Sequence, residues 1–199
     1  MPPYPDRPAV LRCGRCGRSA DWKDARLQVV CGCRSPLELP PPLVREADAA
    51  DRARALEIVG REFGGRQLVA GGQPVSVADA ELLVAETEGG VSGALGWRRI
   101  DGALHIMVLA TDPMWQRSGV GASLLAEAEL LARRHSLPRV LVTVTNDNIP
   151  ALYFYQRRGY RISAVLRGSV AAHAQNRGLV GFAGIPVVDE IQLSKDLST

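Results

Sequence analysis

The sequence predicts an α/β domain with a mixed sheet, preceded by a small cysteine-rich module. Three observations lead to this prediction. Apolar runs joined by short turns occupy residues 80–111, a pattern typical of an antiparallel meander. Strand-like and helix-like segments then alternate along the rest of the chain. All four cysteines lie within the first 33 residues, outside this pattern.

Local sequence signals predict each element of the main domain. Asp48 is a favourable N-cap for a helix that runs to Phe63 and stops at Gly64-Gly65. Asp101-Gly102 is a strong signal for a hairpin. Residues 64–78 are rich in glycine, and we expect a loop there. The expected strands cover residues 43–46, 80–86, 91–100, 103–111, 139–145, 159–166 and 190–193, and the other expected helices cover residues 119–135 and 149–158.

Length and composition indicate a globular protein with one medium-sized domain and an appendage. The chain has 199 residues, of which 46% are hydrophobic and 23% are charged. No apolar run reaches the ~18 residues that cross a bilayer, and the N-terminal residues lack the apolar core of a signal peptide. We therefore expect a cytoplasmic protein with no membrane association, as a monomer or a homodimer. The formal net charge of +3 falls on residues 1–38, a bias too weak to predict nucleic-acid binding by itself.

The cysteines form two close pairs, Cys13-x-x-Cys16 and Cys31-x-Cys33. Four thiolates suit a tetrahedral structural zinc, and cytosolic cysteine pairs hold a metal more often than they form disulfides. The first pair resembles a zinc-ribbon knuckle, whereas the second is C-x-C where ribbons have C-x-x-C. Free thiols and a redox pair are the alternatives. We predict a zinc-ribbon-like module at residues 1–36, a proline-rich linker at 37–42 and the main domain at 43–199.

An anion-binding loop is predicted between the strand at 103–111 and the helix that follows. The sequence WQRSGVG places Gly119 and Gly121 where a helix begins, and there the N–H groups are unpaired and the macrodipole is positive. Glycine lets the backbone approach an anion closely. The dinucleotide pattern G-x-G-x-x-G is absent, because position 124 is Leu, and no Gly-Lys-Ser/Thr of a phosphate-binding P-loop occurs.

Two motifs together resemble those of the GNAT acetyltransferases. QRSGVG at residues 116–121 fits the family signature Q/R-x-x-G-x-G/A, and residues 148–160 match the later motif N-x-x-A-x-x-F-Y-x-x-x-G-Y at every anchor. The resemblance covers about residues 43–199. It implies the GNAT acyl-CoA N-acyltransferase fold, whose two central strands separate to leave a slot. It also implies transfer of an acetyl group from acetyl-CoA to a primary amine.

The resemblance assigns roles to particular residues. Tyr155 would be the general acid that protonates the CoA thiolate, although it can also be read as a core aromatic residue. Asn148 would cap its helix and reach the cofactor. The strand end at Leu109, Ala110 and Thr111 would bind the pantetheine arm. The loop that holds the pyrophosphate would consist of Gln116, Arg117, Ser118, Gly119, Val120, Gly121 and Ala122.

The sequence motifs do not identify the general base or the acceptor directly. Met107 and Val108 stand where many family members carry a carboxylate. We predict Glu190 as the base, with a chain of water molecules as the alternative. Residues 167–186 are expected to border the acceptor pocket, and the acceptor is a small amine, a peptide N-terminus or a lysine side chain. A second hypothesis is a regulatory protein that docks to nucleic acid or protein through the zinc module and senses acyl-CoA.

Overall fold

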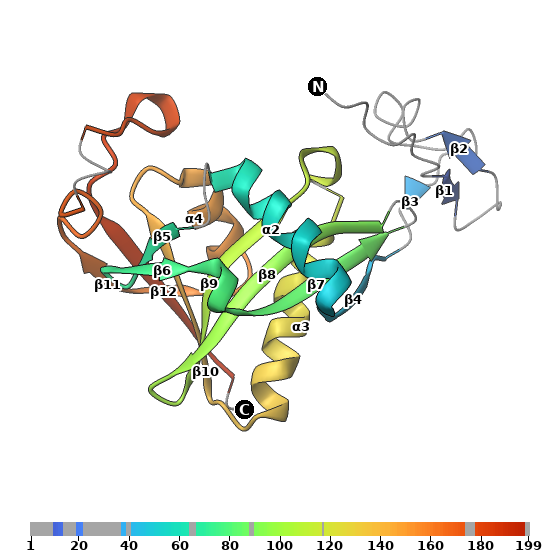
Figure 1. Cartoon of the computed structure of the whole chain (residues 1–199), viewed down its shortest axis with the longest axis horizontal. Helices are drawn as coiled ribbons and strands as arrows, with labels where there is room; N and C mark the ends of the chain where they lie inside the picture. Colours follow the sequence, from blue (N-terminus) through green and yellow to red (C-terminus); the bar gives the residue numbers. More distant parts are fainter. Residues whose placement is uncertain are drawn as a thin grey trace.

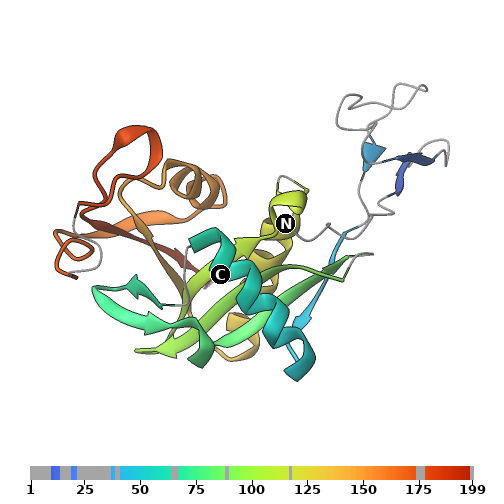
Figure 2. The ribbon, with the colours of Figure 1, turned by 45° about the horizontal axis from the view of Figure 1, so that its top comes forward.

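The computed structural model describes residues 10–13, 19–21, 37–38, 41–63, 67–87, 90–116, 118–173 and 178–197. The main domain is built on a mixed seven-stranded sheet with helices on both faces (Figures 1 and 2). Its strands are β4 (Leu43–Glu46), β7 (Glu81–Thr87), β8 (Gly90–Ile100), β9 (Ala103–Thr111), β10 (Arg139–Thr145), β11 (Arg161–Leu166) and β12 (Glu190–Asp196). The helices are α2 (Ala49–Phe63), α3 (Val120–Arg134) and α4 (Ile149–Gln156), with short 3-10 turns η1 (Val77–Asp79), η2 (Pro113–Trp115) and η4 (Phe182–Gly184).

The strand order is β11-β12-β10-β9-β8-β7-β4, which confirms the predicted meander and the mixed sheet. Strands β4, β7, β8 and β9 pair antiparallel in succession, and β12 pairs antiparallel with both β10 and β11. Only β9 and β10 pair in parallel among the described strands, and α3 connects them. This crossover places the start of α3 at the carboxyl end of β9.

The predicted helix cap at Asp48 and the predicted hairpin turn at Asp101-Gly102 are both present. Asp48 Oδ1 accepts hydrogen bonds from the backbone N–H groups of Ala50 (2.8 Å) and Asp51 (2.9 Å), and it therefore caps α2. Asp101 and Gly102 have φ angles of 48° and 73°, as a two-residue hairpin turn with the twist of its strands requires.

The loop predicted for residues 64–78 is wrong over most of its length. Strands β5 (Gln67–Ala70) and β6 (Gln73–Ser76) pair there as a separate two-stranded sheet, and η1 follows them. The turn between them is Gly71-Gly72, with φ angles of 64° and 75°. The glycines that suggested a loop are the residues that this tight turn needs.

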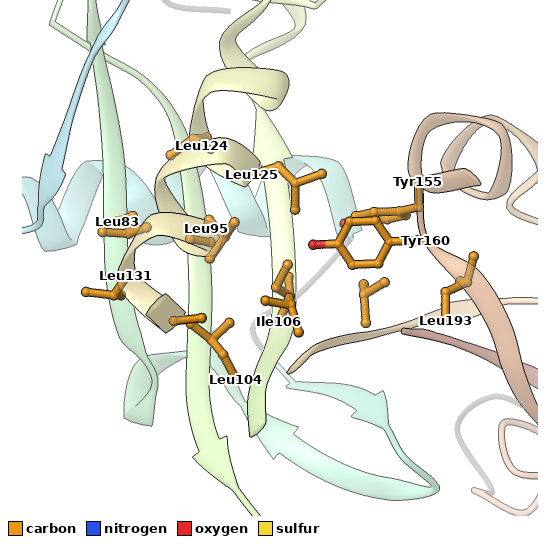
Figure 3. Close-up of a cluster of buried hydrophobic side chains, with 14 of the residues drawn as sticks. Leu83, Leu95, Leu104, Ile106, Leu124, Leu125, Leu131, Tyr155, Tyr160 and Leu193 are labelled. Carbon is orange, nitrogen blue, oxygen red and sulfur yellow. The ribbon is translucent and has the colours of Figure 1, made fainter. Parts of the chain in front are cut away.

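Two buried apolar clusters hold the helices on the sheet. On one face, Leu124 and Leu131 of α3 share a cluster with Leu95 and Leu104, and Tyr155 of α4 belongs to it (Figure 3). On the other face, α2 packs its apolar stripe on β7, β8 and β9. Burial of each large apolar side chain contributes about 1.5–3 kcal/mol. The two helix layers thus fix β8 and β9 from both sides.

The cysteine-rich segment is described only in part. Strands β1 (Val10–Cys13), β2 (Ser19–Asp21) and β3 (Leu37–Glu38) form a three-stranded antiparallel sheet. The residues Cys16, Cys31 and Cys33 lie outside the described residues, so the zinc site and the docking surface stay predictions. In the part of the chain that the structure describes, no group of His, Cys, Asp and Glu is placed to hold a metal, and no helix is long and apolar enough to cross a membrane.

Candidate functional site

Strands β9 and β10 pair over a short distance and then separate. The parallel pairing ends where Ile106 lies opposite Val142, but β9 continues to Thr111 and β10 to Thr145. Within the described strands, residues 107–111 have no partner on the β10 side. Backbone groups on such an open edge bind extended ligands as a neighbouring strand would. This separation is the slot that the family resemblance implies.

A β-bulge at Met107 marks the point of separation. The register between β8 and β9 passes from the pair Trp97–Ile106 to the pair Gly96–Val108, so Met107 has no partner on β8. A bulge bends its strand and increases the local twist. The bend therefore follows the last residue of β9 that pairs with β10.

The glycine loop lies at the carboxyl end of β9. Gly119 has a φ of 95°, a conformation that favours glycine, and α3 begins at the next residue. A Cβ added to Gly121 would lie 3.5 Å from Thr111 Oγ1 and 3.8 Å from Phe154 Cε2. The loop, the end of β9 and α4 therefore meet around Gly121. Arg117 lies outside the described residues.

Leu109 and Thr111 face this junction, whereas Ala110 does not. The Leu109 Cδ2 atom lies 3.5 Å from the Cβ position of Gly121, and Ala110 packs in the cluster on the α2 face. The Gln116 amide donates a hydrogen bond of 3.0 Å to Glu62, and the Ser118 hydroxyl donates to the carbonyl of Trp115. The structure thus brings part of the predicted cofactor-binding set together at the open edge of β9.

Asp112 holds the segment between β9 and α3 in place, a role that was not predicted from the sequence. Its side chain is buried, Oδ1 accepts a hydrogen bond of 2.9 Å from the Met114 N–H, and Oδ2 accepts one of 2.6 Å from Arg54. Arg54 belongs to α2, so this ion pair ties a helix on one face of the sheet to the loop before α3. The signal for it was an Asp before Pro113, a favourable cap for the short turn.

Helix α4 carries the second motif and begins as predicted. Asn148 Oδ1 accepts a hydrogen bond of 3.1 Å from the Ala151 N–H, which confirms the cap. Tyr153 is exposed, whereas Tyr155 is 4% exposed and packs edge-on against Tyr160 with ring centroids 5.5 Å apart. Figure 3 shows both phenol rings directed from this part of the chain toward Leu125 and Ile106. Burial raises the pKa of Tyr155 well above its ordinary value of 10.0, so the phenol stays protonated at neutral pH.

Glu190 has two hydrogen-bond donors that the sequence did not reveal. The residue is 1% exposed, Oε1 accepts from the N–H of Gly71 (3.1 Å), and Oε2 accepts from the N–H of Gly72 (2.7 Å). The carboxylate therefore joins the start of β12 to the tip of the β5–β6 hairpin. These partners were missed because the hairpin itself was not predicted. The role of Glu190 as base stays a prediction.

The segment expected to border the acceptor pocket is attached to the end of β10. Asn146 Oδ1 accepts from the N–H groups of Val188 (2.9 Å) and Asp189 (3.0 Å), and Asp147 accepts from the N–H of Phe182. This network holds the described residues from 178 onward against the β10–α4 turn. It links the loop before β12 to the end of β10, the part of that strand that separates from β9.

A family model places these features in context. The model of the Acetyltransferase (GNAT) family matches residues 54–160, more than half of the chain, and the match includes the glycine loop and the α4 motif. The chain belongs to the GNAT acetyltransferase family. The match excludes the cysteine-rich segment and the last two strands of this GNAT protein.

Two relatives found by sequence similarity match this GNAT chain over only part of their length. The YxbD protein of Bacillus subtilis (strain 168) is 33% identical over 93 residues, which are 45% of this chain and 58% of that protein. A mycothiol acetyltransferase of Clavibacter sepedonicus is 38% identical over 88 residues, 43% of this chain and 29% of that protein. The matched segment thus spans less than two thirds of either relative.

Solved structures share the fold. A GNAT family acetyltransferase from Elizabethkingia anophelis with acetyl-CoA bound superposes with a TM-score of 0.60 at 19% identity. The superposition covers 77% of this chain and 97% of that one. At this level of identity the comparison supports the GNAT fold of the main domain and does not extend to the acceptor.

Proposed function

We propose that this GNAT protein transfers the acetyl group of acetyl-CoA to a primary amine. The observation that carries the proposal is the separation of β9 from β10 beside the glycine loop. An extended pantetheine arm fits the open edge of β9, and the loop N–H groups at the start of α3 are oriented for a pyrophosphate. The acetyl-CoA bound to the Elizabethkingia anophelis enzyme supports the same assignment.

In the proposed reaction the neutral amine nitrogen attacks the thioester carbonyl carbon directly. The C–N bond forms, the C–S bond breaks, and the CoA sulfur leaves as a thiolate that takes the phenolic proton of Tyr155. A tyrosine phenol carries its proton at neutral pH, so the donor is in place before the thiolate forms. The attacking nitrogen loses its proton to a base, either Glu190 or a water molecule, and Tyr155 regains a proton from solvent.

The cofactor contacts in this proposal follow the motif residues. Gly119, Val120, Gly121 and Ala122 would offer loop N–H groups, and the motif residues Gln116, Arg117 and Ser118 would complete the pyrophosphate-binding set. Leu109, Ala110 and Thr111 would offer backbone groups to the pantetheine. Asn148 Oδ1 accepts the cap hydrogen bond, and its Nδ2 group would donate to the cofactor.

Two measurements test the proposal. Isothermal titration of the full chain with acetyl-CoA should give a one-site binding curve. Incubation with acetyl-CoA and a panel of primary amines should release free CoA thiol together with acetylated amine. A protein that binds neither acetyl-CoA nor CoA, or that releases thiol without forming an amide, is not the enzyme proposed.

For the N-terminal residues we propose a structural zinc held by Cys13, Cys16, Cys31 and Cys33. The cysteine spacing carries this proposal, and four thiolates leave no open position for catalysis. Elemental analysis should find about one zinc per chain, lost when all four cysteines are changed to serine. If that variant keeps acetyl transfer but loses a bound protein or nucleic acid, the segment serves docking, as the second hypothesis holds. A wild-type chain without zinc contradicts the metal assignment.

A further inference from the structure

The two faces of β10 and β12 differ in chemistry. Side chains alternate between the faces of a strand. On the α3–α4 face these strands contribute Val140, Val142, Val144 and Leu193 to the buried cluster. On the opposite face, beyond the half-buried Leu141, lie Thr143, Thr145, Glu190 and Gln192, which we call the polar strip. The register sets Thr143 opposite Gln192 and Thr145 opposite Glu190, so the polar strip is continuous across both strands.

The polar strip begins where β10 leaves β9. Thr143 and Thr145 follow Val142, the last residue of β10 that pairs with β9. The open edge of β9 faces the same part of β10. A thioester held on that edge would therefore lie beside the polar strip, and an acceptor amine that attacks it would bind over these side chains.

The β5–β6 hairpin reaches the polar strip from the other side of the domain. Figures 1 and 2 show it extending from the α2 and β7 region toward β12. It forms no ladder with the main sheet, and Leu68 packs with the α2 cluster at its base. Its tip is held by the two hydrogen bonds from Gly71 and Gly72 to Glu190, and a Cβ on Gly72 would lie 3.9 Å from Ser169 Cβ.

Glu190 is well suited to fix the hairpin. A buried carboxylate is costly unless its oxygens are hydrogen-bonded, and each oxygen here has its own backbone donor. Glutamine at this position keeps one acceptor oxygen but turns an NH₂ group toward the second N–H, which pairs donor against donor. The hairpin tip would lose one contact and gain a repulsive one.

We infer that the acceptor is a polar amine with hydroxyl or amide groups, bound over the polar strip, and that Glu190 is a positioning residue that holds the β5–β6 hairpin over it. The inference rests on the proposed acetyl transfer. The Gln192 Oε1 atom already accepts from the Ser163 hydroxyl (3.3 Å), so an acceptor would meet the threonine hydroxyls and the glutamine NH₂ group. An aliphatic acceptor would leave these groups unpaired when it displaced water, whereas hydroxyl or amide groups would replace those hydrogen bonds.

The first test compares shape-matched amines with the wild-type protein and acetyl-CoA. The pairs are ethanolamine with propylamine and glycinamide with isobutylamine. With kcat/KM calculated for the neutral form of each amine, so that differences in amine basicity cancel, we expect the polar member of each pair to have at least a tenfold higher value, about the effect of one lost hydrogen bond. A preference for the aliphatic members overturns the inference, and so does a failure to acetylate either polar member. The exposed Leu179, Val180 and Phe182 nearby are where an aliphatic acceptor would then be sought.

The second test uses Glu190→Gln and Thr143→Val, with Glu127→Gln as a control at a helix position paired with Arg134. For Glu190→Gln we expect KM for the better polar amine to rise about tenfold, faster hydrogen exchange at Gly71 and Gly72, and unchanged acetyl-CoA affinity. The pH profile of kcat should keep its shape. Loss of its acidic limb with a kcat drop of about a hundredfold would instead make Glu190 the base.

Thr143→Val is nearly isosteric and keeps the inference testable if Glu190→Gln does not fold. It should raise KM for the polar amine and leave KM for its aliphatic partner unchanged. Equal effects on both amines, or none on either, overturn the inference. Absence of acetyl-CoA binding in the wild-type protein would be a different result, because it removes the proposed function itself.

Discussion

Ile106 and Val142 are the last residues through which β9 and β10 pair, and the bulged Met107 follows Ile106 directly. The opening in the sheet therefore starts at the bulge on β9. It places the free edge of β9, the glycine loop and Phe154 of α4 around one point near Gly121. A side chain at position 121 should therefore interfere with the ligand more than with the fold.

Gly121→Glu should abolish acetyl-CoA binding, whereas Gly121→Ala should keep it. A Cβ at position 121 makes only ordinary contacts of 3.5–3.8 Å, but a longer chain would fill the junction toward Phe154 and bring a negative charge to a phosphate site. Gly60→Glu is the matched control, because it adds the same charge on α2 where a Cβ meets nothing within 4 Å. Titration calorimetry of the three variants checks this. Normal binding by Gly121→Glu would move the pyrophosphate site elsewhere.

Tyr155→Phe should lower kcat by about 10²–10⁴-fold with little effect on the dissociation constant for acetyl-CoA. The ring keeps its packing against Tyr160, and only the proton donor is lost. Tyr153→Phe is the matched control on the same helix, since Tyr153 is exposed and its hydroxyl accepts from Arg157. Steady-state rates give kcat, and calorimetry gives the dissociation constant for acetyl-CoA. Equal rates for both variants and the wild type would leave Tyr155 as a core residue only.

The buried phenols should make the protein lose stability above about pH 10. Burial raises the pKa of Tyr155 in the folded state above the ordinary value of 10.0, so above that pH the folded chain binds more protons than the unfolded chain. Stability is thus fully present below pH 10 and falls as pH rises toward the folded-state pKa. Urea denaturation at several pH values gives the free energy of unfolding as a function of pH. Above pH 10 this free energy should fall less steeply with pH in Tyr155→Phe than in the wild type, by up to about 1.4 kcal/mol per pH unit. A slope identical to that of the wild type contradicts the burial argument.

The ion pair between Arg54 and Asp112 should contribute more to stability than an exposed pair. Asp112 is buried, and loss of Arg54 leaves its Oδ2 without this 2.6 Å donor. We expect Arg54→Met to reduce the free energy of unfolding by about 1–3 kcal/mol, with partial screening because the arginine is one-third exposed. Arg134→Met, which breaks the exposed pair with Glu127, should cost less than about 1 kcal/mol. Equal costs in urea denaturation would show that burial of Asp112 does not matter.

Sequence signals identified the elements whose causes are local. Asp48, Asp101-Gly102 and Asn148 act within a few residues of their own position, and each forms the predicted cap or turn. The β5–β6 hairpin was missed because Gly71-Gly72 fits both a loop and a tight turn, and its strands are short. Features that depend on pairing between distant segments could not be predicted from the sequence.

The bulge at Met107 and the partners of Glu190 illustrate this limit. The bulge exists only in the register of β9 against β8, and the Glu190 contacts join residues 118 or more positions apart. The motif at 148–160 located Tyr155, but its burial against Tyr160 follows from packing of α4 on the sheet. Sequence reasoning thus found the residues, whereas their geometry required the tertiary structure.

Close packing of α3 on β8 predicts that Gly93→Ala is destabilising. A Cβ at position 93 would lie 2.6 Å from Val120 Cγ1 and 3.1 Å from both the Ala110 carbonyl oxygen and Leu124 Cδ1, so the start of α3 must shift. We expect a loss of about 1–3 kcal/mol in the free energy of unfolding and weaker acetyl-CoA binding, because Val120 is the first residue of α3. The same change at the open position Gly60 should stabilise α2 by about 0.5–1 kcal/mol.

Val120→Ala should partly rescue Gly93→Ala, because it removes the nearest clashing atom. The double variant is then more stable than the sum of the two single effects, by about 0.5–3 kcal/mol, and acetyl-CoA affinity recovers with it. A double-mutant cycle measures the coupling of the two substitutions, in stability by urea denaturation and in acetyl-CoA affinity by calorimetry. Strict additivity would mean that the clash is relieved by the backbone at Ala110, which would separate the packing of α3 from the position of the glycine loop.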